Sequence, residues 1–330
     1  MTTIRTATDP SRLRTALCAG TIVATLPYLA LKIAWVAGSG IGVHGDGMHS
    51  GAMIGANLAT VGMDAVAAVL ALALARPWGR RIPGWLLVLP MFVATGLLAP
   101  IAFVAPVAAV VGAFTGGITS SDQGQDFIEG WVFAMVYGGF GLQAIGLVGG
   151  FVLHARERWA PVFALRLRDL PVGPADGVRR LVVVGVAALG LVPVAIQLCW
   201  AFGSHVLRPD DNRPDAQSLV VNGGYALLTV VGLVGIQALT WRRRDGRPAR
   251  GALVAAWVGT GTSFGWGLFW LLASTVTTPL SRGEDMRGVA VVGGLLAVVG
   301  AVHATVLALL VVEAAGASDD RARRSGMIQA

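Results

Sequence analysis

Long apolar stretches with few charged residues recur along the chain, and short arginine-bearing segments separate them. A membrane-spanning helix needs about 20 mainly apolar residues, and these stretches lack the two-residue alternation of a barrel strand. The pattern therefore predicts an all-α polytopic membrane protein with eight transmembrane helices. The predicted spans lie at about 16–37, 52–75, 84–114, 130–154, 181–203, 218–240, 251–273 and 288–313.

The third predicted span differs from the others because it contains Pro90, Pro100 and Pro106. Proline removes a backbone donor and is a common cause of helix kinks. We therefore expect this span to be kinked or partly unwound, or to consist of two short re-entrant pieces.

Arginine is distributed unequally between the two sides of the predicted bundle. Twenty arginines lie in the N-terminal segment, in the loops after even-numbered spans and in the C-terminal tail, whereas four lie on the other side. Loops rich in Arg face the cytoplasm. We therefore expect a multi-pass protein of the plasma membrane with both termini in the cytoplasm.

The composition agrees with a membrane protein, since 55% of residues are hydrophobic, 13% are charged and the mean hydropathy is +0.70. The net charge of +7 comes from arginines in loops, so we expect no nucleic-acid partner. The expected partners are the lipid bilayer and a hydrophobic small molecule, and the oligomeric state is left open. Abundant Ala, Gly, Val and Arg with almost no Lys is typical of a high-GC actinobacterium.

Two segments resemble each other, "LKIAWVAGS" at 31–39 and "IQLCWAFGS" at 196–204. The matched pairs, 165 residues apart, include Lys32 and Gln197, Trp35 and Trp200, and Asn57 and Asn222. The alternative is coincidence in a hydrophobic alphabet. The correspondence predicts two tandem four-helix repeats in parallel orientation. The predicted parts are a cytoplasmic N-terminus at 1–15, repeats at 16–165 and 166–313, and a cytoplasmic tail at 314–330.

Two charged residues inside predicted spans are the main functional candidates. Lys32 is the only lysine of the chain, and Asp64 lies near the middle of the second span. A charge at a helix centre costs about 2.5–3.5 kcal/mol on insertion scales, so it usually faces a partner or a cavity. The two could pair or line an outward-opening pocket, and Lys32 could also reach the outer interface alone. Their counterparts in the second repeat, Gln197 and Thr229, are uncharged.

Other polar and aromatic residues of the spans could complete a substrate pocket in the outer half. Helical stripes are formed by Trp266, Phe269 and Trp270 in one span and by Phe133, Tyr137 and Phe140 in another. Ordinary packing would account for them equally well. The candidate substrate-binding residues are Trp35, Asn57, Tyr137, Gln143, Gln197, Trp200, Asn222, Tyr225, Trp266, Trp270 and His303.

The loop "GVHGDGMHSG" at 42–51 carries His44, Asp46 and His49. Two imidazoles and a carboxylate are suitable metal ligands, but their spacing fits no known metal motif. They remain weak metal candidates beside the simpler interpretation of a solvated loop. We therefore expect neither a metal nor a cofactor.

A membrane enzyme that cyclises a linear isoprenoid or prenylated substrate would suit these residues. Such a reaction needs an acid, a dry cavity and aromatic faces that stabilise positive charge. A carboxyl group in an apolar site can stay protonated, which makes Asp64 the candidate acid. A neighbouring Lys32 ammonium would instead keep Asp64 ionised, and Asp46 is then the alternative acid.

In size, topology and its tryptophan-rich outer half, the whole chain resembles the integral-membrane terpene cyclases of actinobacterial indole–terpenoid and diketopiperazine–terpenoid pathways. The resemblance implies protonation-initiated cyclisation in secondary metabolism. It carries over no catalytic residue, because no family motif is matched residue by residue.

A proton-coupled transporter of a small or lipophilic molecule is the alternative. Duplicated bundles with an acid in the membrane are typical of transporters. Asp64 would carry the proton, and Lys32 would gate its movement or bind an anion. A structural membrane subunit is a third interpretation.

Overall fold

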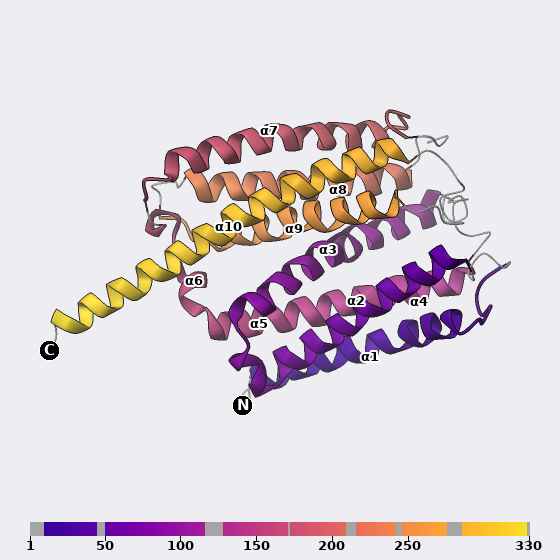
Figure 1. The fold of residues 1–330 in the computed structure, drawn as a ribbon, viewed down its shortest axis with the longest axis horizontal. Coiled ribbons are helices and arrows are strands. Elements are labelled where there is room, and N and C mark those ends of the chain that lie inside the picture. Colours follow the sequence, from indigo (N-terminus) through magenta and orange to yellow (C-terminus); the bar gives the residue numbers. More distant parts are fainter. Residues whose placement is uncertain are drawn as a thin grey trace, which may run out of the picture. The chain divides into compact units, whose positions relative to one another are not determined.

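The computed structural model describes residues 10–44, 50–115, 128–170, 172–208, 216–241, 246–275 and 286–328, with side chains as far as 317. Within these ranges the protein is all-helical, with 87% helix and no strand. The fold is drawn in Figure 1. The α-helices are α1 (Pro10–Val36), α2 (Gly51–Ala75), α3 (Gly84–Thr115), α4 (Gly130–Gln143), α5 (Gly149–Arg158), α6 (Ala160–Ala164), α7 (Asp176–Ala201), α8 (Ala216–Trp241), α9 (Arg250–Ala273) and α10 (Arg287–Ile328).

Seven helical segments of the described chain are long and apolar enough to cross a membrane, with α4 and α5 forming one of them. The protein is therefore a multi-pass helical membrane protein. The predicted span at 251–273 corresponds to α9, a helix of 24 residues, which does not belong to these seven. Glycine, serine and threonine make α9 less apolar than the others.

The predicted third span forms α3, which is one continuous α-helix. The expectation that it unwinds or divides into two re-entrant pieces is wrong. Each of its three prolines removes a single backbone donor, and intact helical turns lie between them. Membrane helices tolerate such prolines where local adjustments satisfy the freed carbonyl groups.

The predicted fourth span is interrupted, a feature that sequence analysis missed. The α-helix α4 ends at Gln143, a π-helical segment runs from Ala144 to Val148, and α5 continues from Gly149. Such π-helical turns inside α-helices are frequent at functional sites. The helical register changes directly after a buried polar residue, Gln143.

The chain forms two compact units, and their boundary falls in α3 between Met91 and Phe92. The first unit contains α1, α2, the beginning of α3, α4 and α5. The second contains the rest of α3 and α6 to α10. These units are defined by packing, whereas the predicted repeats at 16–165 and 166–313 rest on sequence correspondence and stay a prediction.

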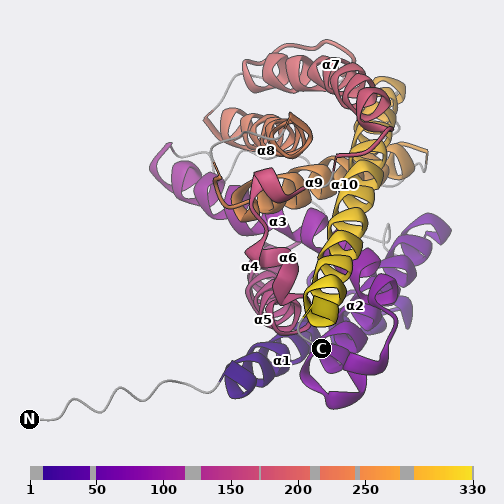
Figure 2. The same cartoon turned by 90° about the vertical axis from the view of Figure 1, so that its left-hand side faces the viewer.

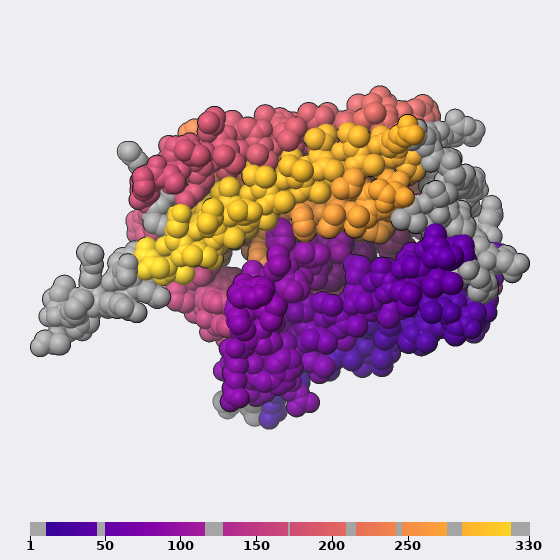
Figure 3. Space-filling model, viewed as in Figure 1, coloured from indigo at the N-terminus to yellow at the C-terminus, as the bar shows by residue number. Residues whose placement is uncertain are grey.

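In the second unit, α9 is packed by other helices on several sides. Helix α10 packs against α9 and α7, as Figure 2 shows in end view and Figure 3 at the surface. A β-carbon added at Gly232 of α8 would lie 2.6 Å from the carbonyl carbon of Gly259 in α9. One added at Gly267 would lie 2.4 Å from a backbone nitrogen of α10. Glycine therefore lets these helices approach backbone to backbone, as is common in membrane bundles.

This enclosure explains the composition of α9. A helix shielded from lipid by its neighbours needs no fully apolar surface, and hydroxyl groups can bond to the carbonyl one turn back. Thr260 donates to Ala256 O at 2.6 Å and Ser263 donates to Gly259 O at 3.0 Å. Both side chains are buried.

We predict that Gly232→Ala destabilises the folded protein, because the added methyl group has no space between α8 and α9. Overpacking typically costs about 1–3 kcal/mol. The measurement is the thermal unfolding midpoint of the full chain in detergent. Gly223→Ala on the same helix is the matched control, since a β-carbon there meets nothing within 4 Å. Equal midpoints for the two variants would contradict the close packing of α8 on α9.

Candidate functional site

Lys32 and Asp64 form an ion pair in the interior of the first unit. The Lys32 Nζ donates to the Asp64 Oδ2 at 3.2 Å, and the two residues are 0% and 4% exposed. Of the arrangements that the sequence left open, pairing is the one observed. Lys32 does not extend alone to the membrane interface, so that alternative is wrong.

Packing between α1 and α2 brings the pair together. The hydroxyl group of Ser50 caps the N-terminus of α2 by accepting a hydrogen bond from Met53 N at 3.4 Å. Asn57 and Asp64 are both buried on this helix, as expected for residues seven positions apart. Asp64 therefore projects toward α1 from the interior face of α2.

Tyr28 completes the immediate surroundings of the ammonium group. The Lys32 Nζ lies 3.8 Å from the centroid of the Tyr28 ring, within the range of a cation–π interaction. That ring makes an edge contact with Phe140 of α4 at 5.4 Å between centroids. Sequence reasoning missed Tyr28, although its position one turn before Lys32 was a usable signal.

The pair belongs to a longer row of residues on α1, here called the α1 seam. Its members follow one another at alternating spacings of four and three residues, which places them on one face of the helix. The α1 seam consists of Arg14, Cys18, Thr21, Thr25, Tyr28, Lys32 and Trp35. All are buried except Tyr28, which is partly buried. The interior face of this membrane helix is thus polar for most of its length.

The middle of the α1 seam contacts the π-helical segment. Gln143 Nε2 donates to Thr25 Oγ1 at 2.8 Å, and Thr25 donates in turn to Thr21 O at 2.9 Å. A β-carbon added at Gly146 would lie 2.3 Å from Thr21 Oγ1. The last residue of α4 and the π-helical segment after it therefore place a buried amide and a close helix contact against the α1 seam.

Ion pairs occupy the arginine-rich end of the first unit. Arg14 of the α1 seam donates to Glu157 at the end of α5, and Arg80 donates to the same carboxylate at 2.8 Å. Polar side chains thus extend along α1 from this end to the Lys32–Asp64 pair.

The corresponding face of α7 lies 165 residues later and is here called the α7 seam. It consists of Arg179, Val183, Val186, Gly190, Pro193, Gln197 and Trp200. Its arginine has the same kind of partner as Arg14, since Arg179 Nη2 donates to Glu313 of α10 at 2.5 Å. Its interior is almost entirely apolar. The two seams share their ends and differ in their centres.

The tryptophans at the other end of the two seams make equivalent hydrogen bonds. Trp35 Nε1 donates to Ile41 O at 2.8 Å, and Trp200 Nε1 donates to Val206 O at 2.7 Å. Both indoles are buried and close the turn after their helix.

The turns themselves also match. The amide of Gly38 donates to Trp35 O and that of Gly203 to Trp200 O, both at 3.0 Å. The two glycines have φ of 94° and 81°, a backbone conformation that other residues adopt at a cost. Glycine is therefore favoured three residues after each of the two tryptophans.

A separate aromatic cluster lies in the second unit. The Tyr225 ring contacts Trp266 at 5.2 Å and Trp270 at 5.3 Å between centroids, and Trp270 contacts Trp200 at 6.1 Å. Phe269 packs against Trp266 at 5.2 Å. These five residues are here called the aromatic cluster. The predicted stripe on α9 thus contacts aromatic side chains of α7 and α8.

The remaining predicted residues are placed separately. Asn222 Nδ2 donates to Ser218 O at 3.1 Å, within its own helix. His303 is fully buried, with Nε2 3.4 Å from Val183 O. Gln197 is buried and its Oε1 has no hydrogen-bond partner among the described residues. Tyr137 is 50% exposed on α4.

One of the three candidate metal ligands in the loop at 42–51 lies within the described residues. His44 is exposed, whereas Asp46 and His49 lie outside the described residues. Within the described ranges, no group of three or more His, Cys, Asp or Glu side chains could hold a metal ion.

No family model, no curated protein and no solved structure matches the chain, so comparison with known proteins assigns it to no family. The fold and the site define the class by themselves. This is a multi-pass helical membrane protein with a buried lysine–aspartate pair in its first unit.

We predict that Lys32→Gln and Asp64→Thr each destabilise the protein by about 3–5 kcal/mol, because each leaves an uncompensated buried charge. The substituted residues are those found at the matching positions of α7 and α8. The double variant is expected to recover most of the loss, since no lone charge remains. Thermal unfolding of all four forms in detergent measures this coupling. Additive losses in the double variant would contradict a direct interaction.

Proposed function

We propose that the protein spans the plasma membrane eight times as two tandem four-helix repeats, with both termini in the cytoplasm. Two contacts in the second unit support the repeat. The Phe92 ring of α3 contacts the Trp257 ring of α9 at 5.2 Å. A β-carbon on Gly96 would lie 2.1 Å from Gly261 O.

Each of these contacts joins two residues that are 165 positions apart. Contact between a residue and its own counterpart is what two copies of one helix produce when they pack about a two-fold axis. The helices α3 and α9 therefore behave as equivalent third helices of two repeats. In this proposal α9 is the seventh of the eight spans.

We propose proton-coupled transport of a small organic anion as the function, with Lys32 and Asp64 as the coupling site. The observation that carries this proposal is the polar α1 seam, whose centre is replaced by apolar residues in the α7 seam. A scaffold needs only the shared ends of the two seams. The polar centre is costly in a membrane and is therefore assigned to function.

Charge balance in the buried site provides the coupling. A proton added to Asp64 removes its negative charge and leaves the Lys32 ammonium without a counter-ion. An unpaired buried charge is strongly unfavourable, and an anion bound at Lys32 would restore neutrality. Proton binding at Asp64 and anion binding at Lys32 therefore favour each other, and this coupling is reciprocal.

The other neighbours of the pair fit this exchange. Once Asp64 is protonated and no longer pairs with Lys32, the Tyr28 ring would still stabilise the ammonium group by its cation–π contact. Thr25 and Gln143 supply hydroxyl and amide groups farther along the α1 seam. A proton moving toward the arginine-rich end would meet these groups in order.

Isoprenoid cyclisation is the second candidate, and the aromatic cluster is the observation that favours it. Its five rings could stabilise positive charge on a substrate. Asp64 is a poorer candidate for the acid, because its carboxyl group already accepts a hydrogen bond from Lys32 Nζ. Asp46 would then supply the proton.

We predict that full-length protein in liposomes couples an inward gradient of an alkyl sulfonate to acidification of the lumen, read by an enclosed pH dye. Sulfonates stay anionic, so they do not cross the bilayer as neutral acids. Asp64→Asn is expected to abolish the proton signal and to keep sulfonate binding. Lys32→Gln is expected to lose both.

Thr229→Ala, at the position that corresponds to Asp64 in α8, is the control and should transport normally. An unchanged proton signal in Asp64→Asn would remove this residue from the mechanism. Absence of any sulfonate-linked signal from folded protein across a range of chain lengths would contradict the transport proposal.

For the second candidate, membranes containing the protein are given linear prenylated substrates, and products are examined by mass spectrometry. Cyclisation predicts an isomer of equal mass and different retention, lost in Asp46→Asn. An isomer lost instead in Asp64→Asn would move the acid to the ion pair. No isomer from any substrate would reject cyclisation.

A further inference from the structure

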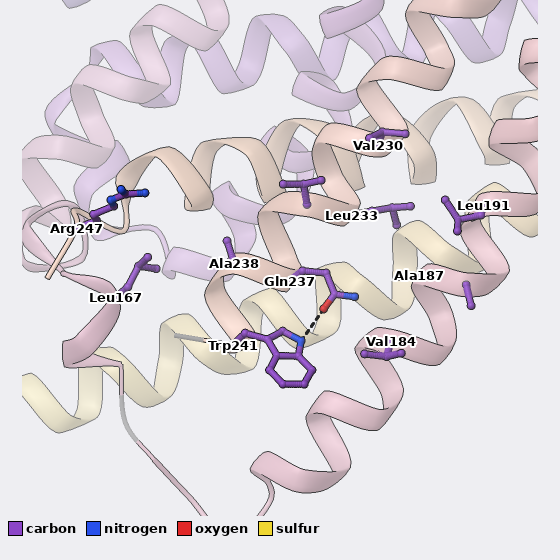
Figure 4. A pocket seen from close by; sticks show the side chains of 12 residues that line it. Leu167, Val184, Ala187, Leu191, Val230, Leu233, Gln237, Ala238, Trp241 and Arg247 are labelled. Carbon is purple, nitrogen blue, oxygen red and sulfur yellow. Dashed lines mark hydrogen bonds between the residues drawn. The ribbon is translucent and has the colours of Figure 1, made fainter. Parts of the chain in front are cut away.

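An apolar groove with a basic end runs between α7 and α8 in the second unit. Its volume is about 680 Å³, within the range of about 300–1,000 Å³ for ligand pockets. Figure 4 shows the groove and the side chains that line it. Its apolar walls include Ala187, Ala188 and Leu191 of α7 and Val230, Leu233 and Val234 of α8.

The small side chains of α7 account for the hollow. Ala187 and Ala188 face larger residues of α8 and leave space that a leucine or phenylalanine would fill. The groove is accessible from the side of the bundle, since Leu191 is 56% and Val234 is 61% exposed. In a membrane this side faces lipid chains.

The polar side chains that line the groove lie toward its arginine-rich end. The indole of Trp241 donates to Gln237 Oε1 at 2.8 Å, a bond drawn in Figure 4. Arg247 lines this end. Arg180 lies outside the lining but next to it, with its guanidinium carbon 5.2 Å from the Trp241 ring. Each arginine carries a planar guanidinium group with five N–H donors, which is a suitable partner for a phosphate group.

The length of the groove matches one leaflet of a bilayer. Along α8 it extends from Val230 to Trp241, about 17 Å at about 1.5 Å per residue. Half of a hydrocarbon core is about 15 Å. An acyl chain in the apolar part would therefore place its headgroup beside Trp241, a residue type enriched at membrane interfaces.

We propose that this groove binds an anionic phospholipid, with an acyl chain between α7 and α8 and its phosphate at Arg180 and Arg247. Charge complementarity selects this occupant over a zwitterionic lipid, because basic pockets between membrane helices bind acidic headgroups. The groove belongs to the second unit and its occupancy does not depend on transport at Lys32 and Asp64.

Native mass spectrometry of the full chain in detergent tests the proposal. The probes are phosphatidylglycerol and phosphatidylcholine with identical acyl chains. Phosphatidylglycerol is expected to bind more tightly, and Arg180→Ala and Arg247→Ala are expected to weaken it about fivefold each. Arg156→Ala, on α5 at an arginine-rich segment but outside the groove, is the charge-matched control and should bind normally.

A second pair of variants fills the groove without changing charge. Ala187→Phe and Val234→Phe each place a phenyl ring in the groove, the first from α7 and the second from α8. Because Val234 is exposed, its replacement leaves the core intact. Both are expected to reduce lipid binding at least fivefold. Equal binding of the two lipids, or unchanged binding in both filled variants, would overturn the proposal. So would a dimer that is lost when the groove is filled, because a second chain would then be the occupant.

Discussion

The burial of Lys32 and Asp64 as a pair is the constraint on which the first unit depends. Taking two charges out of water costs several kcal/mol for each ion, and only close geometry with further contacts offsets the cost. The structure supplies that geometry through the 3.2 Å bond and the Tyr28 ring. Helices α1 and α2 must hold this register, because a displacement of either would leave a charge alone in the membrane interior.

The comparison of the two seams separates what the scaffold requires from what the site adds. Both seams begin with an arginine bound to a glutamate and end with a tryptophan that closes a glycine turn. These contacts satisfy polar groups at the ends of helices, where they cost least. Between them, the α1 seam is mostly polar, whereas Gln197 is the single polar residue of the α7 seam. Because the α7 seam also packs in a helical bundle, a helix at this position of the fold does not in general need a polar centre.

In the second unit, close contacts between helix backbones fix the packing of the helices, as the ion pair does in the first unit. Hydrophobic burial does not drive association between helices in lipid, so packing and interhelical bonds do. Gly232, Gly259 and Gly267 bring α8, α9 and α10 together at distances that no larger residue allows. These close contacts with α8 and α10 explain why α9 can contain glycine, serine and threonine in its interior.

The sequence by itself determined the class of the protein and most of its helices, because apolar runs of membrane length have few alternatives in lipid. It also singled out Lys32 and Asp64, since a charge inside a span is costly wherever its partner lies. It could not decide that the two pair, nor that Tyr28 completes the site, because both depend on how α1 and α2 rotate against each other.

The sequence also could not decide that α3 stays helical through three prolines, or that a π-helical segment follows Gln143. The sequence also did not reveal that the indoles of Trp35 and Trp200, both candidate substrate-binding residues, close the turns after their helices. Only tertiary structure decides such cases, because a polar side chain takes whichever partner packing brings within reach.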